Sequence, residues 1–327
     1  EELLEPEDAK KLLSVGALLN YLAPDRMELL YGVKEVLRRA SAPTRADLVR
    51  LKRLVRYVIG QRRMVARYDW QEVPSHITVY VDSDFAGCLR TRKSTVGGCI
   101  FMGTHCVKAW SKTLPILALS TGEAELGGVV KGTVEGKGFK ALLQDVGHDT
   151  RINLKSDATA TIGMVARLGL GKVRHLAVSD LWVQQEARRG VITYDKVDGA
   201  KNPADLMTKP VDAQTLHSHL RRMGVELVSG RSSLAPMNRS YDDQGGEDQI
   251  TDQVRHIVPE NEVSPTPLDQ VCDPPSDRCT SEPNQLATMW NKVETDLRTV
   301  RQLWPDKRSQ LDAPRRLRTP LEMPMRS

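Results

Sequence analysis

The sequence predicts an α/β fold in which a mixed sheet is packed with helices. Three strand-like runs follow one another between residues 76 and 111, and helix-like and strand-like segments then alternate as far as residue 222. Consecutive strands pair as a meander, whereas a strand that follows a helix joins the sheet by a crossover. We therefore expect a mixed five-stranded sheet flanked by helices, preceded by a small helical segment and followed by a disordered tail.

The N-terminal part of the chain, residues 1–70, is expected to be helical. Residues 10–38 and 44–60 predict two helices, and Thr44 is in the right place to cap the second one. One face of that second helix is apolar and carries Leu48, Leu51, Val55 and Val58.

The same helix is rich in positive charge. Between Arg45 and Arg67 there are eight basic residues and a single acidic residue, Asp47. Such a run is typical of a solvated helix face, but it also suits a surface that follows nucleic-acid phosphates. The residues alone leave both interpretations open.

Residues 76–225 are expected to form the main domain. Ile77, Val79 and Val81 alternate with polar residues, which is the pattern of a half-buried strand. Turns near residues 87–93 and 103–104 divide the first three strands. The remaining expected elements are a helix at 121–147, a strand at 152–156, helices at 158–168 and 175–189, a strand at 191–197 and a helix at 203–222.

The C-terminal part, residues 229–327, is expected to be mostly disordered, with at most one short helix at 287–304. Eleven of the 18 prolines of the chain lie beyond residue 228. A segment with so many prolines and few apolar residues cannot bury enough surface to offset its ordering entropy.

Four acidic residues stand at the ends of these predicted elements, in the order Asp82, Glu125, Asp157 and Asp205. The gaps between them are 43, 32 and 48 residues, so separate elements can deliver each carboxylate to one cleft. Carboxylates crowded in this way repel one another, and a bound cation relieves the repulsion. The order therefore predicts a site for two divalent cations.

The local sequences support this placement. Asp82 closes the first strand of the meander and Asp157 closes a later strand. Ser120 or Thr121 can cap the helix that carries Glu125 on its first turns. Asp205 follows an Asn-Pro pair, which is a signal for the start of a helix.

Six sequence blocks follow one another along the chain: VDSDFAG, RKSTVGG, AWSKTLPILALSTGEAEL, SDATATI, VRHLAVSDLWVQQEARRG and NPADLMTKP. In order and spacing they resemble the ribonuclease H domain of copia-type LTR retrotransposon polyproteins. The resemblance covers roughly residues 76–222, and residues 10–70 are similar to the end of the preceding reverse transcriptase region. The polymerase element YxDD is absent, so polymerisation is not predicted.

The resemblance implies a ribonuclease H fold and a metal-dependent endonuclease that hydrolyses the RNA strand of RNA/DNA hybrids during reverse transcription. It favours Asp82 over Asp84 and Glu125 over Glu123 as metal ligands, and Asp84 is then expected to point to the opposite face of its strand. Two Mg²⁺ ions are expected, with Mn²⁺ as a substitute, because Mg²⁺ prefers oxygen ligands and activates water for phosphodiester hydrolysis.

The resemblance also implies substrate contacts and partners. The partners are the RNA/DNA hybrid and the upstream reverse transcriptase part of the same polyprotein. Since a hybrid is read through its backbone, 2′-hydroxyls and groove shape, little sequence specificity is expected. The candidate substrate-binding residues are Arg92, Lys93, Ser94, Lys172, Arg174 and His175.

Two alternatives to an active ribonuclease H are open. An integrase shares the fold but uses the order Asp, Asp, Glu, which is not the order found here. The other is a degenerate remnant that binds nucleic acid without cutting it. The helix of Glu125 contains five glycines at 127, 128, 132, 136 and 138, which together could cost about 4 kcal/mol relative to alanine. Tight packing of the helix would explain one or two of these glycines, and decay of the retroelement copy would explain the others.

Composition excludes several other classes. No apolar run reaches the roughly 18 residues that a membrane span needs, so no membrane partner is expected. The five cysteines show neither a CxxC pair nor a zinc spacing with histidine, which is typical of free intracellular thiols. An intracellular location, cytoplasmic or nuclear, is therefore expected.

Overall fold

The computed structural model describes residues 2–169, 171 and 178–230. The predicted tail at 229–327, with its short helix at 287–304, lies almost wholly outside these residues. The elements are α1 (Pro6–Leu22), η1 (Met27–Leu29), α2 (Leu30–Leu37), α3 (Arg45–Gly60), β1 (Arg63–Ala66), β2 (His76–Asp84), β3 (Thr95–Met102), β4 (His105–Thr113), α4 (Thr121–Asp145), β5 (Arg151–Ser156), α5 (Thr159–Ala166), η2 (Val178–Leu181), α6 (Trp182–Arg188), β6 (Ile192–Lys196), η3 (Gly199–Lys201), η4 (Pro203–Met207), α7 (Ala213–Arg222) and β7 (Val225–Val228).

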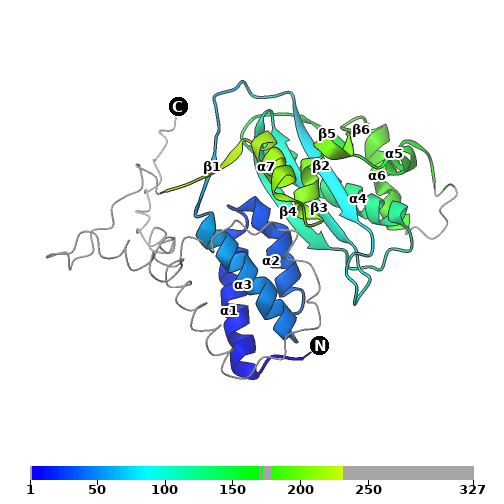
Figure 1. Cartoon of the computed structure of the whole chain (residues 1–327). Helices are drawn as coiled ribbons and strands as arrows, with labels where there is room; N and C mark the ends of the chain where they lie inside the picture. The colour runs from blue at the N-terminus through cyan, green and yellow to red at the C-terminus, as the bar shows by residue number, and fades with distance from the viewer. Residues whose placement is uncertain (1, 170, 172–177, 231–327) are drawn as a thin grey trace, which may run out of the picture. The chain divides into compact units, whose positions relative to one another are not determined.

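The central feature is a five-stranded sheet with the order β4-β3-β2-β5-β6 (Figure 1). β2, β3 and β4 pair antiparallel, and β5 pairs parallel with both β2 and β6. The meander and the crossovers therefore occur where the sequence predicted them. The predicted mixed five-stranded sheet flanked by helices is confirmed.

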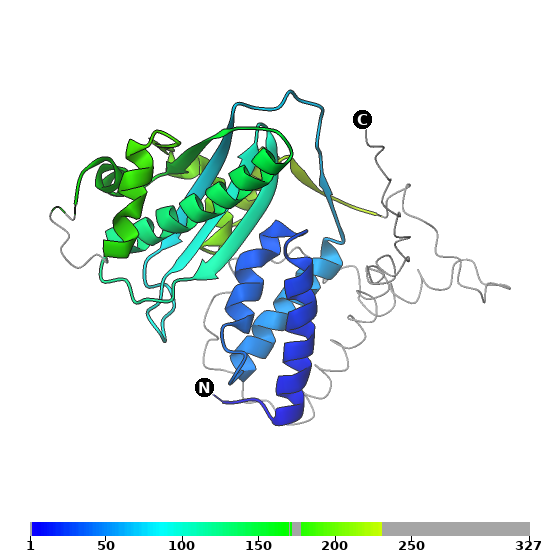
Figure 2. The same cartoon turned by 180° about the vertical axis from the view of Figure 1, so that it is seen from behind.

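Helices cover the sheet on both faces. The long helix α4 lies along one face together with α5 and α6, as the rear view shows (Figure 2). The alternating apolar residues of β2 pack beneath these helices in one core. Helix α7 lies on the other face (Figure 1), and η4 contacts β2 and β3. That core includes Ile77, Val79, Val81, Leu126, Val129, Ile152, Leu154, Met164 and Ile192.

The helical segment agrees with the sequence in its second helix and differs in its first. The single predicted helix at 10–38 is wrong, because α1 ends at Leu22 and α2 begins only at Leu30. Pro24 lies in the break, and a proline removes a backbone donor that a continuous helix needs. Thr44 caps α3 as predicted, in a capping box with Asp47.

A proline also divides the predicted helix at 203–222. The chain forms the short η4, passes Pro210 and begins α7 at Ala213, where Asp212 caps the helix by accepting from the Thr215 N–H at 2.9 Å. The predicted helix at 175–189 lies partly outside the described residues, and its described part forms η2 and α6.

A two-stranded sheet was not predicted. β1 pairs antiparallel with β7, so that residues 63–66 lie beside residues 225–228. This pair joins the chain just before the five-stranded sheet to the chain just after it. The predicted domain limits, 1–70, 76–225 and 229–327, stay predictions.

The glycines of α4 have a packing role that the sequence did not predict. A Cβ atom added at Gly132 would lie 2.4 Å from Val81 Cγ1, and one at Gly136 would lie 3.1 Å from Val79 Cγ2. At Gly128 the nearest atom would be the Asp82 carbonyl oxygen at 3.4 Å. Three glycines one turn apart thus line the helix face against the sheet, more than the one or two expected, and they weaken the case for decay.

Two alanine substitutions in α4 are expected to have opposite effects on stability. Gly138→Ala should raise the free energy of unfolding by about 0.8 to 1 kcal/mol, because alanine restricts the unfolded chain more, and a Cβ there meets no other atom within 4 Å. Gly132→Ala should lower it by about 1 to 3 kcal/mol through overpacking against Val81. Urea unfolding of both variants checks this, and equal stabilisation by both would contradict the close approach of helix and sheet.

Candidate metal centre

Two of the four predicted acids stand where adjacent parallel strands end. Asp82 is near the carboxyl end of β2, and Asp157 directly follows β5. β2 and β5 pair in parallel with Val79 opposite Leu154, so their carboxyl ends meet at the same edge of the sheet. In open α/β sheets this edge is where ligands bind.

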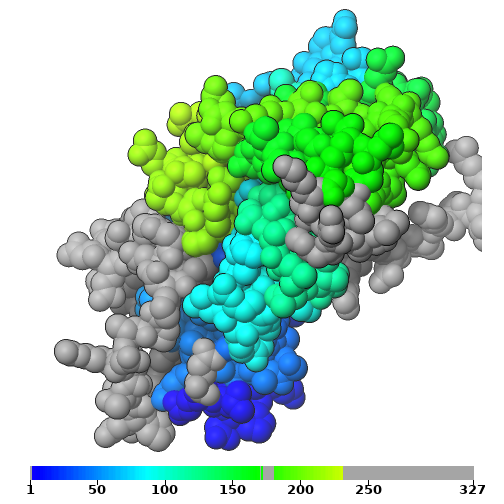
Figure 3. All heavy atoms as spheres, turned by 90° about the vertical axis from the view of Figure 1, so that its right-hand side faces the viewer, coloured from blue at the N-terminus to red at the C-terminus, as the bar shows by residue number. Residues whose placement is uncertain are grey.

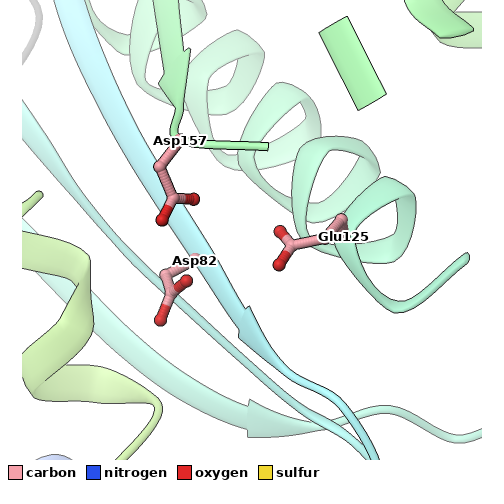
Figure 4. Close-up of side chains that lie close together, drawn as sticks. All are labelled: Asp82, Glu125 and Asp157. Carbon is pink, nitrogen blue, oxygen red and sulfur yellow. The ribbon is translucent and has the colours of Figure 1, made fainter. Parts of the chain in front are cut away.

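Helix α4 brings Glu125 to the same edge. The Ser120 hydroxyl caps the helix by accepting from the Glu123 N–H at 3.2 Å, and the Glu123 carboxylate accepts from the Leu119 N–H at 2.6 Å. Glu123 is therefore engaged at the helix start. Glu125, one residue beyond Ala124, turns its carboxylate toward Asp82 and Asp157 (Figure 4).

These three carboxylates form a compact group. One oxygen from each of Asp82, Glu125 and Asp157 lies within 4.8 Å of the others. Asp82 is only 4% exposed, and the other two are partly buried. A set of oxygen donors so close together suits a hard divalent cation such as Mg²⁺, and the residues present therefore fit the predicted metal.

Asp205 adjoins the group on the side of Asp82. Its element, η4, is anchored by the fully buried Asn202, whose Nδ2 donates to the Val81 carbonyl oxygen at 2.9 Å and whose Oδ1 accepts from the Ala204 N–H at 3.2 Å. Asp205 lies outside the 4.8 Å group but interacts directly with the carboxyl of Asp82. The structure thus brings all four predicted acids to one place.

Two further residues of the centre were not predicted as site residues. The Thr208 hydroxyl donates to Asp82 Oδ2. Lys209 Nζ lies 3.0 Å from Asp205 Oδ1 and 3.8 Å from Asp82 Oδ2. The only available signal was their spacing, since residues three and four positions after Asp205 fall on its side of a helical turn.

The centre carries more negative charge than Lys209 balances. Burial and the neighbouring Asp205 raise the pKa of Asp82 to about 6. Burial, with Asp82 and Asp157 nearby, raises the pKa of Glu125 to about 8. Burial and Asp82 also raise the pKa of Asp157. A cation that binds among these carboxylates stabilises their ionised form.

These shifts predict how stability depends on pH without divalent ions. The pKa of Glu125 in the folded protein lies above the ordinary value of 4.5. The contribution of this carboxyl group to the free energy of unfolding is therefore fully present below pH 4.5 and is lost as pH rises through about 8. The melting temperature in EDTA should therefore fall between pH 7 and pH 9 more in the wild type than in Glu125→Gln. The thermal transition of both proteins at each pH measures this difference.

The comparison with Glu125→Gln isolates this carboxyl from Cys88, which titrates in the same range with the opposite sign. Burial would raise the pKa of the Cys88 thiol, but hydrogen bonds from Thr91 and Arg38 outweigh it and lower the pKa to about 7. Parallel pH dependences for the two proteins would contradict the raised pKa of Glu125.

The prediction that Asp84 points to the face opposite Asp82 is wrong. β2 stays regularly paired to its end, with Asp82 opposite Gly97 and Asp84 opposite Thr95, and residues two apart in a regular strand share a face. Asp84 is instead separated from the three-carboxylate group by its place at the strand end. There burial raises the pKa of Asp84, and the positive charges of Lys34 and Arg38 of α2 partly offset this rise.

The candidate substrate residues have different surroundings. Arg92 is exposed in the β2–β3 loop with a left-handed backbone (φ 53°), and Lys93 next to it is partly exposed. Ser94 is fully buried and its hydroxyl accepts from the Ala86 N–H at 3.0 Å, so this side chain holds the loop and does not face solvent. Lys172, Arg174 and His175 lie outside the described residues.

Some of the basic side chains of α3 form ion pairs with acidic residues of the same chain. Arg50 Nη1 pairs with the buried Asp47 at 2.9 Å, and Arg45 Nη1 pairs with Glu2 at 2.9 Å. Arg56 is exposed and Arg53 is partly exposed. Contact of this helix with nucleic acid stays a prediction.

None of the helices in the described part of the chain has the length and apolar character of a membrane span.

Sequence comparison relates the chain to retrotransposon proteins. It is 36% identical over 121 residues to the "Uncharacterized mitochondrial protein AtMg00810" of Arabidopsis thaliana, with 37% of this chain and 49% of that protein covered. It is 24% identical over 241 residues to the "Retrovirus-related Pol polyprotein from transposon RE1" of the same plant, with 69% of this chain but 15% of the polyprotein covered. The chain thus spans about half of the first relative and a small part of the second.

A third sequence relative is also a retrotransposon polyprotein. The "Retrovirus-related Pol polyprotein from transposon TNT 1-94" of Nicotiana tabacum is 24% identical over 200 residues, covering 61% of this chain and 15% of the polyprotein. Among solved structures, LC11-RNase H1, isolated from compost, is 15% identical with a TM-score of 0.32, and 41% of this chain and 94% of that chain are covered. No protein-family model matches the chain.

Proposed function

We propose that this chain, whose homologues are retrotransposon Pol polyproteins, is a ribonuclease H-type endonuclease of a copia-type element that cuts the RNA strand of RNA/DNA hybrids. The observation that carries the proposal is the meeting of four carboxylates at the carboxyl ends of β2 and β5. Its natural partners would be the hybrid and the reverse transcriptase part of the same polyprotein, in the cytoplasm or the nucleus.

The acids would divide the binding of two Mg²⁺ ions between them, with Mn²⁺ as a substitute. Asp82, Glu125 and Asp157 would hold one ion, because their oxygens form the close group. Asp82 and Asp205 would hold the other, because these two carboxylates interact with each other and share Lys209 as a neighbour. When bound, such ions make a water molecule acidic enough to attack a phosphodiester and neutralise the charge on the leaving 3′ oxygen.

The other residues of the centre orient these acids. Thr208 donates a hydrogen bond to Asp82, which fixes the direction of that carboxylate. Asn202 holds η4 against the β2 backbone, and Asp205 is thereby kept beside Asp82. Lys209 balances part of the charge, and the Asp82 and Asp205 carboxylates keep its pKa raised although burial opposes this. Lys209 therefore stays positively charged at neutral pH, where it can attract a phosphate.

A cleavage assay tests the proposal. The full chain is incubated with end-labelled RNA/DNA hybrid, duplex DNA or duplex RNA, with Mg²⁺, with Mn²⁺ or with EDTA. We expect cuts only in the RNA strand of the hybrid, only with a divalent ion, and with little sequence preference. Binding of the hybrid with no cleavage under any of these conditions would instead support the alternative, an inactive remnant that only binds nucleic acid.

A further inference from the structure

Helix α2 contacts a row of polar residues at one end of the five-stranded sheet. Asp84, Thr95 and Thr113 pair in succession across β2, β3 and β4 and form the last such row at this end. Arg38 Nη2 lies 3.2 Å from the hydroxyls of both Thr95 and Thr113. Lys34 Nζ lies 2.6 Å from the Thr95 hydroxyl. Two basic residues of the helical segment thus bind the ends of neighbouring strands.

The two basic side chains are largely withdrawn from water. Their exposed fractions are 14% for Lys34 and 11% for Arg38, and Glu35 pairs with both at 2.6 and 2.8 Å. In the space-filling view, the blue surface of the helical segment adjoins the cyan surface around the end of β2 (Figure 3). Removal of one partner from such a network leaves an uncompensated buried charge, which is strongly destabilising.

This row lies next to the metal centre. Asp82, opposite Gly97, is only two residues before Asp84 on the same face of the same strand. The loop that follows is tied back by the Ala86 N–H, which donates to the buried Ser94 hydroxyl at 3.0 Å. A shift of the Asp84 row would therefore move the strand end that carries Asp82.

We propose that Lys34 and Arg38 are positioning residues of the metal centre, which hold the row Asp84–Thr95–Thr113 and thereby keep Asp82 in register with Glu125 and Asp157. The inference rests on one part of the proposed function, the binding of divalent ions by the centre. It assigns to the segment related to reverse transcriptase a part in building the nuclease site, since α2 lies outside residues 76–225.

The sign of the effect on metal affinity separates positioning from simple electrostatics. Lys34 and Arg38 are positive charges near an acidic centre, so their removal alone would strengthen divalent cation binding. Loss of positioning would weaken it, because the carboxylate oxygens would no longer meet. Weaker binding after removal of two positive charges is therefore the outcome that charge alone does not produce.

The test measures Mn²⁺ affinity by calorimetry on the full chain, well below its thermal transition. We expect the double variant Lys34→Met, Arg38→Met to bind Mn²⁺ at least five times more weakly than the wild type. The matched control Arg53→Met, Arg56→Met removes two charges from α3 in the same segment and should stay within twofold. Arg38→Lys retains the positive charge but not the planar guanidinium, so it should weaken Mn²⁺ binding less than the double variant does.

A milder variant covers the case in which the double variant does not fold. Thr113→Val removes one acceptor of Arg38 and should weaken Mn²⁺ binding about twofold. Unchanged or tighter binding in the folded variants would overturn the inference, and a wild type that binds no Mn²⁺ would overturn it together with the proposed function. If the wild type cleaves hybrids and the variants keep full Mn²⁺ affinity, only the positioning role is refuted. If the wild type binds Mn²⁺ but does not cleave hybrids, only the proposed nuclease activity is refuted.

Discussion

Replacement of Asp82 by asparagine is expected to abolish hybrid cleavage while leaving the fold intact. Asp82 belongs to the close group of three carboxylates and also adjoins Asp205, so it is the acid that both proposed ion sites share. Changes to the outer-shell partners of metal ligands cost about 10- to 100-fold, and loss of a shared ligand should cost more. Cleavage rates with saturating hybrid and Mg²⁺ measure the effect.

The fold of this variant should be at least as stable as the wild type without divalent ions. Burial and Asp205 raise the pKa of Asp82 to about 6, so at pH 8 the wild type holds a charge that its surroundings disfavour. Asparagine removes that charge and can still accept from Thr208. Asp145→Asn on the exposed end of α4 is the matched control and should cleave normally. Undiminished cleavage by Asp82→Asn would refute the assignment of the centre.

Replacement of Asn202 by alanine should damage both stability and activity, although Asn202 is not one of the acids. The side chain is fully buried and bridges η4 to the Val81 carbonyl beside Asp82. A buried carbonyl left without its donor costs about 1 to 3 kcal/mol. Asp205 and Thr208 would lose their fixed place, and cleavage at limiting Mg²⁺ should fall by about 10- to 100-fold.

Two measurements separate these effects in Asn202→Ala. Urea unfolding gives the loss of stability, and a Mg²⁺ titration of cleavage gives the loss of ion affinity, which higher Mg²⁺ should partly restore. Asn202→Asp keeps the acceptor for the Ala204 N–H and removes the donor to Val81, so it should reproduce most of the defect. Full activity of Asn202→Asp would show that the bridge to β2 does not position η4.

The elements near the site could be predicted because their signals are local. The alternation of Ile77, Val79 and Val81 indicates a strand with one buried face, and Ser120 marks the start of α4. Where a predicted helix proved wrong, a proline inside it, Pro24 or Pro210, was the neglected signal. The glycines of α4 could not be interpreted in this way, since their fit against Val79 and Val81 depends on a helix-to-sheet distance that no local pattern encodes.

The candidate site likewise has some features that the sequence predicts and others that only the tertiary structure shows. By itself the sequence determined the order of secondary structure around the sheet and the four acids at the ends of its elements, because periodicity, caps and spacing are properties of neighbouring residues. Only the tertiary structure decided that Asp84 shares a face with Asp82, that Lys209 lies among the acids and that α2 contacts the strand ends. These features depend on contacts between residues far apart in the chain, and such contacts are set by how whole elements pack against one another.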